Sequence, residues 1–176
     1  MPGAAEAGFL AKGVAIGPDV TLRLVADGDE KAAISRTILE ALPDWFGLPA
    51  ALDGYVEGVR TLPFVAAFAS DGRAVGFLAL KRQSPVAAEA YVLGVHPDLH
   101  RCGVGRRLFT MAEAVARENG ARWLTVKTLA PEAGDPAYER TRRFYEALGF
   151  EPIEVFETLW GPENPCLLML KPLRRA

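Results

Sequence analysis

The sequence has few of the residues that mark secreted, membrane or metal-binding proteins. Its 176 residues include two cysteines, Cys102 and Cys166, too few for a disulfide framework, so we expect a cytoplasmic protein in a reducing compartment. No apolar run reaches the roughly 18 residues of a membrane span, and the first residues do not resemble a signal peptide. The two histidines, His96 and His100, share one turn, and no metal-ligand spacing accompanies them.

The sequence also lacks a strong net charge. A formal net charge of -2 gives no global basic field, so we expect neither nucleic acid nor an anionic membrane as a partner. Any anion site must therefore be local. Half of the residues are hydrophobic and 24% are charged, which is enough apolar material for a core. We expect a possibly flexible tail over residues 1–20 and one domain over residues 21–173.

Hydrophobic periodicity predicts an alternation of strands and helices. Asp71-Gly72 is a hairpin turn signal between two of the strands, and Gly120 and Gly149 follow two of the helices. The resulting order, β-α-α-β-β-β-α-β-α-β-β, indicates an α+β (layered α/β) domain. The expected strands are 21–25, 62–69, 73–81, 86–95, 122–129, 150–159 and 166–173, and the expected helices are 27–42, 49–60, 103–119 and 137–148.

The run "HRCGVGRRLF" (100–109) places three arginines, Arg101, Arg106 and Arg107, at the start of a predicted helix. Cations are unfavourable at a helix N-terminus, so their presence indicates an anionic ligand. A dinucleotide fingerprint would need a third glycine at Leu108, and the P-loop pattern is missing. The alternative is a glycine-rich helix entry with surface arginines and no ligand.

Two segments carry a resemblance to a known family. His100-Arg101-Cys102-Gly103-Val104-Gly105 resembles the Q/R-x-x-G-x-G/A motif of the GNAT N-acetyltransferases, with His100 as its departure. "FYEALGF" (144–150) resembles a second GNAT segment. The resemblance extends over about residues 21–173. It implies a mixed, mostly antiparallel central sheet with helices on both faces, splayed after Val92 between the strands at 86–95 and 122–129.

The resemblance also implies acetyl-CoA as cosubstrate, with its pyrophosphate over the amides of Arg101 to Arg106. Gly94 would mark a bulge that opens the sheet, and the Val95 amide would donate to the thioester carbonyl. Tyr138 stands where the family often has an Asn that contacts the cofactor. The implied cofactor-binding residues are Leu93, Val95, His100, Arg101, Cys102, Gly103, Val104, Gly105, Arg106 and Tyr138.

Acetyl transfer to an amine needs a base for the amine proton and an acid for the departing thiolate. By resemblance, Tyr145 supplies the acid. Glu89, six residues before Val95, matches the base position of the histone-acetylating members; the alternative is a carboxylate on the solvent side of its strand. Cys102 has no partner set for nucleophilic catalysis, and we read it as a backbone donor.

Two loops place aromatic residues among prolines and glycines, and in the family these loops line the acceptor side. Trp45, Phe46 and Trp160 are the candidate substrate-binding residues, with Asp44 or Glu163 to attract an amine; plugs under loops are the alternative. The prediction is transfer of an acetyl group, through a ternary complex, to a primary amine of a small molecule or peptide. A homodimer, a non-catalytic acyl-CoA-binding regulatory module and an interaction domain without a ligand stay open.

Overall fold

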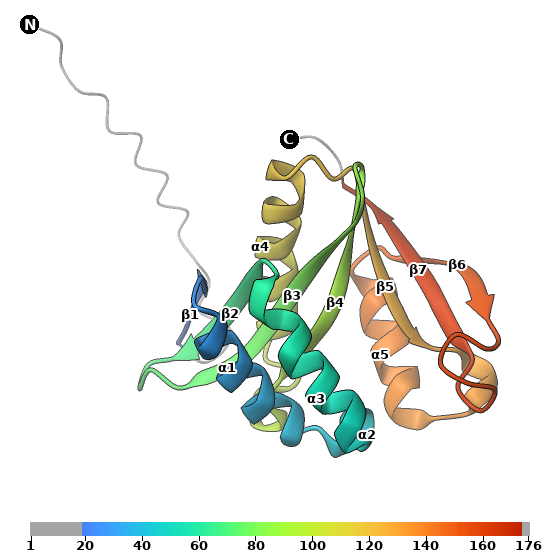
Figure 1. Ribbon diagram of the computed structural model, residues 1–176, viewed down its shortest axis with the longest axis horizontal. Coiled ribbons are helices and arrows are strands. Elements are labelled where there is room, and N and C mark those ends of the chain that lie inside the picture. Colours follow the sequence, from blue (N-terminus) through green and yellow to red (C-terminus); the bar gives the residue numbers. More distant parts are fainter. Residues whose placement is uncertain (1–18, 174–176) are drawn as a thin grey trace, which may run out of the picture.

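A computed structural model describes residues 19–173, which fold around one seven-stranded sheet with the order β1-β2-β3-β4-β5-β7-β6 (Figure 1). The predicted tail lies almost entirely outside the described residues. The strands are β1 (Val20–Leu24), β2 (Phe64–Ala69), β3 (Ala74–Ser84), β4 (Ala87–Val95), β5 (Trp123–Leu129), β6 (Glu151–Phe156) and β7 (Cys166–Pro172). The helices are α1 (Gly28–Glu40), α2 (Pro43–Phe46), α3 (Pro49–Gly58), α4 (Val104–Glu118) and α5 (Pro136–Ala147).

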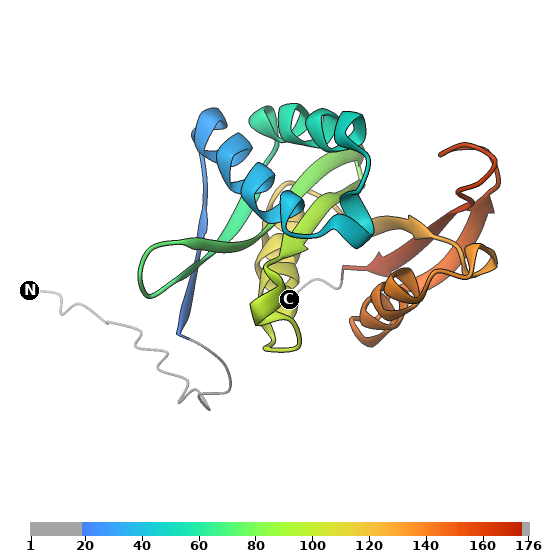
Figure 2. The same cartoon turned by 90° about the horizontal axis from the view of Figure 1, so that it is seen from below.

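Helices cover both faces of this sheet, as expected. Figure 2 shows α1 and α3 on one side and α4 and α5 on the other. One core cluster lies between the first face and α1 and α3, with Ile38, Phe64 and Phe77 at its centre. The other lies under α4 and α5 and includes Leu108 and Phe109. No helix among residues 19–173 is both long and apolar enough to cross a membrane.

Local signals place the ends of these elements. The Asp27 carboxylate accepts from the Glu30 amide at 2.8 Å and begins α1, and Asp135 caps α5 in the same way. Gly120, with φ +87°, follows α4 in the left-handed conformation that glycine adopts without strain. The Asp71-Gly72 turn joins β2 to β3 as an antiparallel hairpin. Pro43 ends the first predicted helix and begins the separate short helix α2.

The splay between β4 and β5 is the feature that positions the site. These strands pair in parallel through three residue pairs, the last being Glu89 with Thr125. The sheet therefore opens after Glu89, three residues earlier than the predicted opening after Val92. In Figure 1 the two strands diverge toward the lower edge of the picture. Every other strand pairing is antiparallel. The expected mixed, splayed sheet is confirmed.

The bulge that bends β4 lies at Tyr91 and not at Gly94. Val92 pairs with Ala79 and Ala90 pairs with Leu80, so Tyr91 is the extra residue. Gly94 is regularly paired with Phe77. A Cβ there would lie 2.8 Å from Ile38 Cγ2 and 2.9 Å from Leu42 Cδ1, so this glycine lets α1 pack closely on β4. The prediction of a bulge at Gly94 was wrong in its position.

Candidate active site

One cavity of about 870 Å³ follows the opening between β4 and β5. It extends from Glu89, where the strands separate, to the start of α4, and α5 and the loop before β7 complete its walls. It brings together all but one of the predicted catalytic, cofactor-binding and aromatic substrate-binding residues. The lining residues from the prediction are Trp45, Phe46, Glu89, Leu93, Val95, His100, Arg101, Gly103, Val104, Gly105, Arg106, Tyr138, Tyr145 and Trp160.

Cys102 is the predicted cofactor-binding residue that does not line this cavity. Its thiol is half-buried in the turn and donates to the His100 carbonyl at 3.5 Å, so the side chain faces its own loop. Its place between two left-handed residues explains this orientation. Arg101 has φ +63° and Gly103 has φ +80°. Such alternation curves the backbone into a concave turn of the kind that binds anions, although the Cys102 N–H, a predicted donor, already donates to the Leu99 carbonyl at 3.4 Å.

The start of α4 adds further donors to this concave turn. No side chain of the described residues caps the helix, so its leading N–H groups are free to bind a ligand. Arg101 has no ion-pair partner within residues 19–173, and Arg106 reaches only the Ala147 carbonyl, at 3.5 Å. A cavity wall with free amides and free guanidinium groups has the chemistry of a phosphate site.

Gly105 has a different role from Gly103. A Cβ at Gly105 would lie 3.0 Å from the Phe144 ring, so this glycine lets α5 approach α4. A Cβ at Gly103 would meet nothing within 4 Å, and Gly103 is needed for its positive φ. Gly103 therefore meets a conformational requirement of the motif, and Gly105 meets a packing requirement.

His100, the departure from the family motif, closes the turn onto β4. Its Nε2 lies 2.7 Å from the Val95 carbonyl oxygen, so that nitrogen carries the proton and donates. The Val95 carbonyl consequently points away from β3. Because the N–H and C=O of a strand residue point to the same edge, the Val95 and Leu93 amides face the opening beside β5. This supports the prediction that these two residues offer backbone groups to a ligand.

Trp45 connects α2 to α5 across the cavity. Its indole N–H donates to Thr141 Oγ1 at 2.9 Å, and its carbonyl accepts from the Tyr138 hydroxyl at 3.1 Å. Its ring also meets the His100 ring edge-on, with centroids 6.1 Å apart. Burial raises the pKa of Tyr138 to about 12, so the phenol stays a donor. Trp45 thus lies beside α5 and beside the turn that contains His100. The Tyr138 hydroxyl is already paired with the Trp45 carbonyl.

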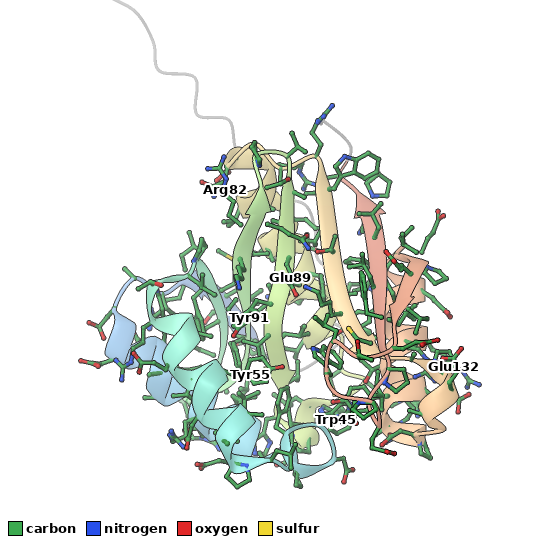
Figure 3. The ribbon with its side chains drawn as sticks, turned by 45° about the vertical axis from the view of Figure 1, so that its right-hand side comes forward. Trp45, Tyr55, Arg82, Glu89, Tyr91 and Glu132 are labelled. Carbon is green, nitrogen blue, oxygen red and sulfur yellow. The ribbon has the colours of Figure 1, made fainter. Side chains whose placement is uncertain are left out.

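Glu89 lies where β4 and β5 separate, on the face covered by α1 and α3. It is 8% exposed, which excludes the alternative of a solvent-side carboxylate. The Lys127 ammonium on β5 donates to Glu89 Oε1 at 2.8 Å. Figure 3 shows Glu89 at this point, above Tyr91, Tyr55 and Trp45. Lys127 escaped the sequence analysis because the pair spans two strands far apart in the chain.

Tyr145 is buried on α5 among Phe109, Phe144 and Phe150, with ring centroids 5.8–6.0 Å away. It also lines the cavity. Burial raises the pKa of Tyr145 well above that of free tyrosine, so the hydroxyl keeps its proton. A protonated phenol in an apolar wall can donate a hydrogen bond or a proton to a group in the cavity.

Two further polar groups belong to this region and were missed from the sequence. The Thr128 hydroxyl on β5 is buried and has no hydrogen-bond partner among the described residues, although Thr128 lines the cavity. A buried unpaired hydroxyl is costly unless a ligand pairs with it. Cys166 is buried on β7 near Lys127 and Glu89, and burial raises the pKa of its thiol to about 11. Cys166 is therefore a protonated thiol at neutral pH.

Aromatic side chains form the wall on the α3 side of Glu89. Phe46 contacts Tyr55 with centroids 5.7 Å apart, and Tyr55 contacts Tyr91 at 5.5 Å. Burial raises the pKa of Tyr55, and the nearby Glu89 charge adds to the rise. Leu159 and Trp160 line the other side. The predicted amine-attracting carboxylates, Asp44 and Glu163, do not line the cavity, because both side chains point to solvent.

Comparisons with known proteins agree with this geometry. The acetyltransferase (GNAT) domain family model matches residues 62–152, just over half of the chain. A search of curated proteins finds no match.

Solved structures share the fold at low sequence identity. A Desulfovibrio desulfuricans protein described as a GNAT-family acetyltransferase is 21% identical with a TM-score of 0.75, covering 88% of this chain and 99% of its own. An aminoglycoside 6'-N-acetyltransferase complexed with coenzyme A is 17% identical with a TM-score of 0.67, covering 89% and 98%. A GNAT acetyltransferase from Elizabethkingia anophelis with acetyl-CoA bound is 13% identical with a TM-score of 0.67, covering 88% and 98%. At these identities the likeness establishes the fold.

Proposed function

The chain belongs to the GNAT acetyltransferase family, and from this premise we propose that it transfers the acetyl group of acetyl-CoA directly to a primary amine within a ternary complex. One observation carries the proposal: a single cavity joins the opening beside β4 to the uncapped start of α4. The cavity therefore offers backbone donors to a thioester arm and a cationic, amide-lined surface to a pyrophosphate.

The residues present fit acetyl-CoA. The pyrophosphate is placed over the concave backbone from Arg101 to Arg106, with the two arginine side chains as counter-ions. The Leu93 and Val95 amides face the arm that enters between β4 and β5. Thr128 supports the same placement, since its buried hydroxyl needs a partner that the described residues do not supply. The bound thioester supplies the activated acetyl group.

Glu89 is proposed as the base for the acceptor amine. A primary amine has a pKa near 10 and is mostly protonated at neutral pH, so it must lose a proton to attack. Glu89 is the one carboxylate among the described residues that line the cavity, and it lies where the strands part. Its carboxylate accepts one proton of the ammonium and passes it to solvent. The neutral nitrogen then bonds to the acetyl carbon, and it loses a second proton as the carbon–sulfur bond breaks.

Tyr145 is proposed as the acid that protonates the departing sulfur. Its raised pKa makes transfer to a free thiolate unfavourable, but the same apolar surroundings raise the pKa of a buried thiol. Burial raises the pKa of the Cys166 thiol on β7 to about 11 in the same way. The second amine proton replaces the one that Tyr145 gives up, so the products are an N-acetylated amine and CoA with a free thiol.

Thermal unfolding with and without acetyl-CoA tests the proposal. Ligand at 100 times Kd adds about 2.7 kcal/mol, which raises Tm by roughly 5–10 °C for a chain of this size. Arg101→Gly removes the guanidinium and keeps a backbone that tolerates positive φ, so affinity should fall by roughly tenfold.

Arg73→Gln is the matched control, because Arg73 pairs with Asp71 on the hairpin turn and does not line the cavity. It should bind acetyl-CoA as the unmodified protein does. Thiol release over a panel of amines then separates an enzyme from a binding module. Unchanged thermal stability at saturating acetyl-CoA would rule out the cofactor, and stabilisation without thiol release for any amine would rule out the transferase.

A further inference from the structure

The charges around Glu89 restrict the kind of amine that this site accepts. Glu89 is the one carboxylate among the described lining residues, whereas Lys81, Arg101, Arg106, Lys127 and Arg140 all carry positive charge. Arg101 and Arg106 belong to the proposed pyrophosphate surface. Lys81 and Lys127 lie instead at the other end, next to the proposed base.

Two lysines flank Glu89 from the neighbouring strands. Lys81 on β3 is the register partner of Glu89, and its ammonium lies 5.3 Å from the centre of the Tyr91 ring. Lys127 on β5 holds the carboxylate at 2.8 Å, and the two side chains are 23% and 11% exposed. The acceptor end of the cavity therefore has a carboxylate that is already paired and a second ammonium without an ion-pair partner among the described residues.

An amine that approaches Glu89 competes with Lys127 for the same carboxylate. A simple cation that wins this competition leaves Lys127 as an unpaired, mostly buried charge, which is costly. An amine that also carries a carboxylate avoids this cost, because its nitrogen pairs with Glu89 while its carboxylate pairs with Lys127. The Glu89–Lys127 ion pair thus offers one oppositely charged partner to each charge of a zwitterionic amine.

The remaining wall is apolar. Tyr55 and Tyr91 stand beside Glu89 on one side, as Figure 3 shows, and Leu159 and Trp160 line the cavity on the other. Such a space suits an aliphatic or aromatic side chain and gives no acidic contact to additional ammonium groups.

We infer that the acceptor is an amine with a carboxylate close to its nitrogen and an apolar body, as in an apolar α-amino acid. This rests on the proposed function. Lys127 binds the carboxylate, Lys81 strengthens the positive field, and Glu89 receives the amine. Polycationic acceptors such as polyamines or aminoglycosides would find one paired carboxylate and several cations. The fold likeness to an aminoglycoside acetyltransferase therefore does not extend to its acceptor.

Steady-state kinetics on matched pairs tests the inference. The pairs are L-phenylalanine with 2-phenylethylamine, L-leucine with 3-methylbutylamine, and L-methionine with 3-(methylthio)propylamine, which differ in structure by the carboxylate alone. Rates are compared per neutral amine, because the α-carboxylate lowers the pKa of the ammonium group. Spermidine and kanamycin serve as polycations. We expect kcat/KM to be at least about tenfold higher for the amino acid of at least one pair, the gain of one charge-assisted contact.

Lys127→Met should reduce that ratio toward one. Lys171→Met is the matched control, since Lys171 forms a similar Lys–Glu pair with Glu113, with exposures of 21% and 14%, outside the cavity. It should leave the ratio unchanged. The panel on the unmodified protein decides the question even if a variant fails to fold.

Faster acetylation of the decarboxylated amines or the polycations overturns this inference and leaves the proposed transferase intact. Acetyl-CoA binding with no amino acid of the panel acetylated also overturns it. If acetyl-CoA does not stabilise the protein, the proposed function itself is wrong. The failure of the acceptor inference and the failure of the proposed function are therefore distinguishable.

Discussion

At the scale of single residues, the site combines a carboxylate held by an ammonium with a phenol held in an apolar wall. Glu89 and Lys127 come from two strands at the point where these strands separate. Tyr145 is surrounded by phenylalanine rings on the opposite face. Each group is therefore fixed by packing before a substrate arrives, which lowers the cost of orienting it for proton transfer.

Glu89→Gln should lower kcat by about 10²–10⁴-fold at neutral pH if Glu89 takes the amine proton. The loss should shrink toward pH 10, where a larger share of the amine is already neutral. Initial rates measured across this pH range check the prediction.

Glu113→Gln is the control for the Glu89 variant, because it removes the carboxylate of the similar Glu113–Lys171 pair outside the cavity. It should leave the pH profile unchanged. An equal loss for Glu89→Gln at every pH would assign Glu89 a structural role.

Tyr145→Phe removes one hydroxyl and keeps the ring in its aromatic cluster, so acetyl-CoA affinity should stay nearly unchanged. We expect kcat and kcat/KM to fall together by about 10²–10⁴-fold, as for an interaction made mainly in the transition state. Stopped-flow thiol release at saturating substrate measures it. Turnover at the unmodified rate would mean that water or another group protonates the sulfur.

At the scale of elements, β4 performs several tasks along its length. It pairs with β5 up to Glu89, carries the bulge at Tyr91, and then presents the edge with Leu93 and Val95 to the cavity. The extra residue at Tyr91 turns both Tyr91 and Val92 toward the α1 and α3 face. One irregular residue thus separates the aromatic wall beside Glu89 from the backbone that is proposed to bind the cofactor.

Gly94→Ala tests the close packing of α1 on this strand. The added methyl would meet Ile38 and Leu42 at 2.8 and 2.9 Å, so α1 must move away from β4. We expect a loss of about 1–3 kcal/mol in the free energy of unfolding, measured by chemical denaturation. An acetyl-CoA affinity and a free energy of unfolding equal to those of the unmodified protein would contradict this account.

Gly54→Ala is the control for the packing test. Gly54 lies in α3, and a Cβ there would meet nothing within 4 Å. The substitution should therefore be neutral or stabilise the protein by up to about 1 kcal/mol, the difference in helix propensity.

At the scale of the whole molecule, two half-sheets meet around the cavity and share the core under α4 and α5, whereas the core under α1 and α3 belongs to the β1–β4 half alone. The half with β1 to β4 carries α1 and α3, and the half with β5 to β7 carries α5. Trp45 ties them together through hydrogen bonds to Thr141 and Tyr138. Half-buried Tyr55 and Tyr138 and buried Tyr145 lie along this junction, and desolvation raises the pKa of all three.

These raised pKa values predict a loss of stability in alkali. An unfolded tyrosine loses its proton near pH 10, while buried Tyr145 keeps it, so above pH 10 the native state binds more protons than the unfolded chain. The stability that Tyr145 contributes through its raised pKa is fully present below pH 10. It declines above pH 10 by up to about 1.4 kcal/mol per pH unit. Urea denaturation of the unmodified protein and Tyr145→Phe should give curves that diverge only above about pH 10. Parallel curves would show that Tyr145 titrates normally.

The sequence by itself determined the order of the elements and most members of the site. Caps such as Asp27 and turns such as Asp71-Gly72 act over a few residues, and hydrophobic periodicity reports which face of each element is buried. The Gly103-Val104-Gly105 motif is local in the same sense. Its geometry depends on one turn and the helix that follows it, so its residues could be named before any contact was known.

Only the tertiary structure decided how the polar groups are paired. Lys127 meets Glu89 because a parallel strand pair ends at Glu89, and no short-range pattern encodes a contact between residues so far apart in the chain. The bulge lies at Tyr91, whereas Gly94 is regularly paired and gives α1 the room to pack closely on β4. Asp44 and Glu163 lie in solvent while Lys81 and Lys127 flank Glu89, and thus strand register, not composition, set the charge around Glu89.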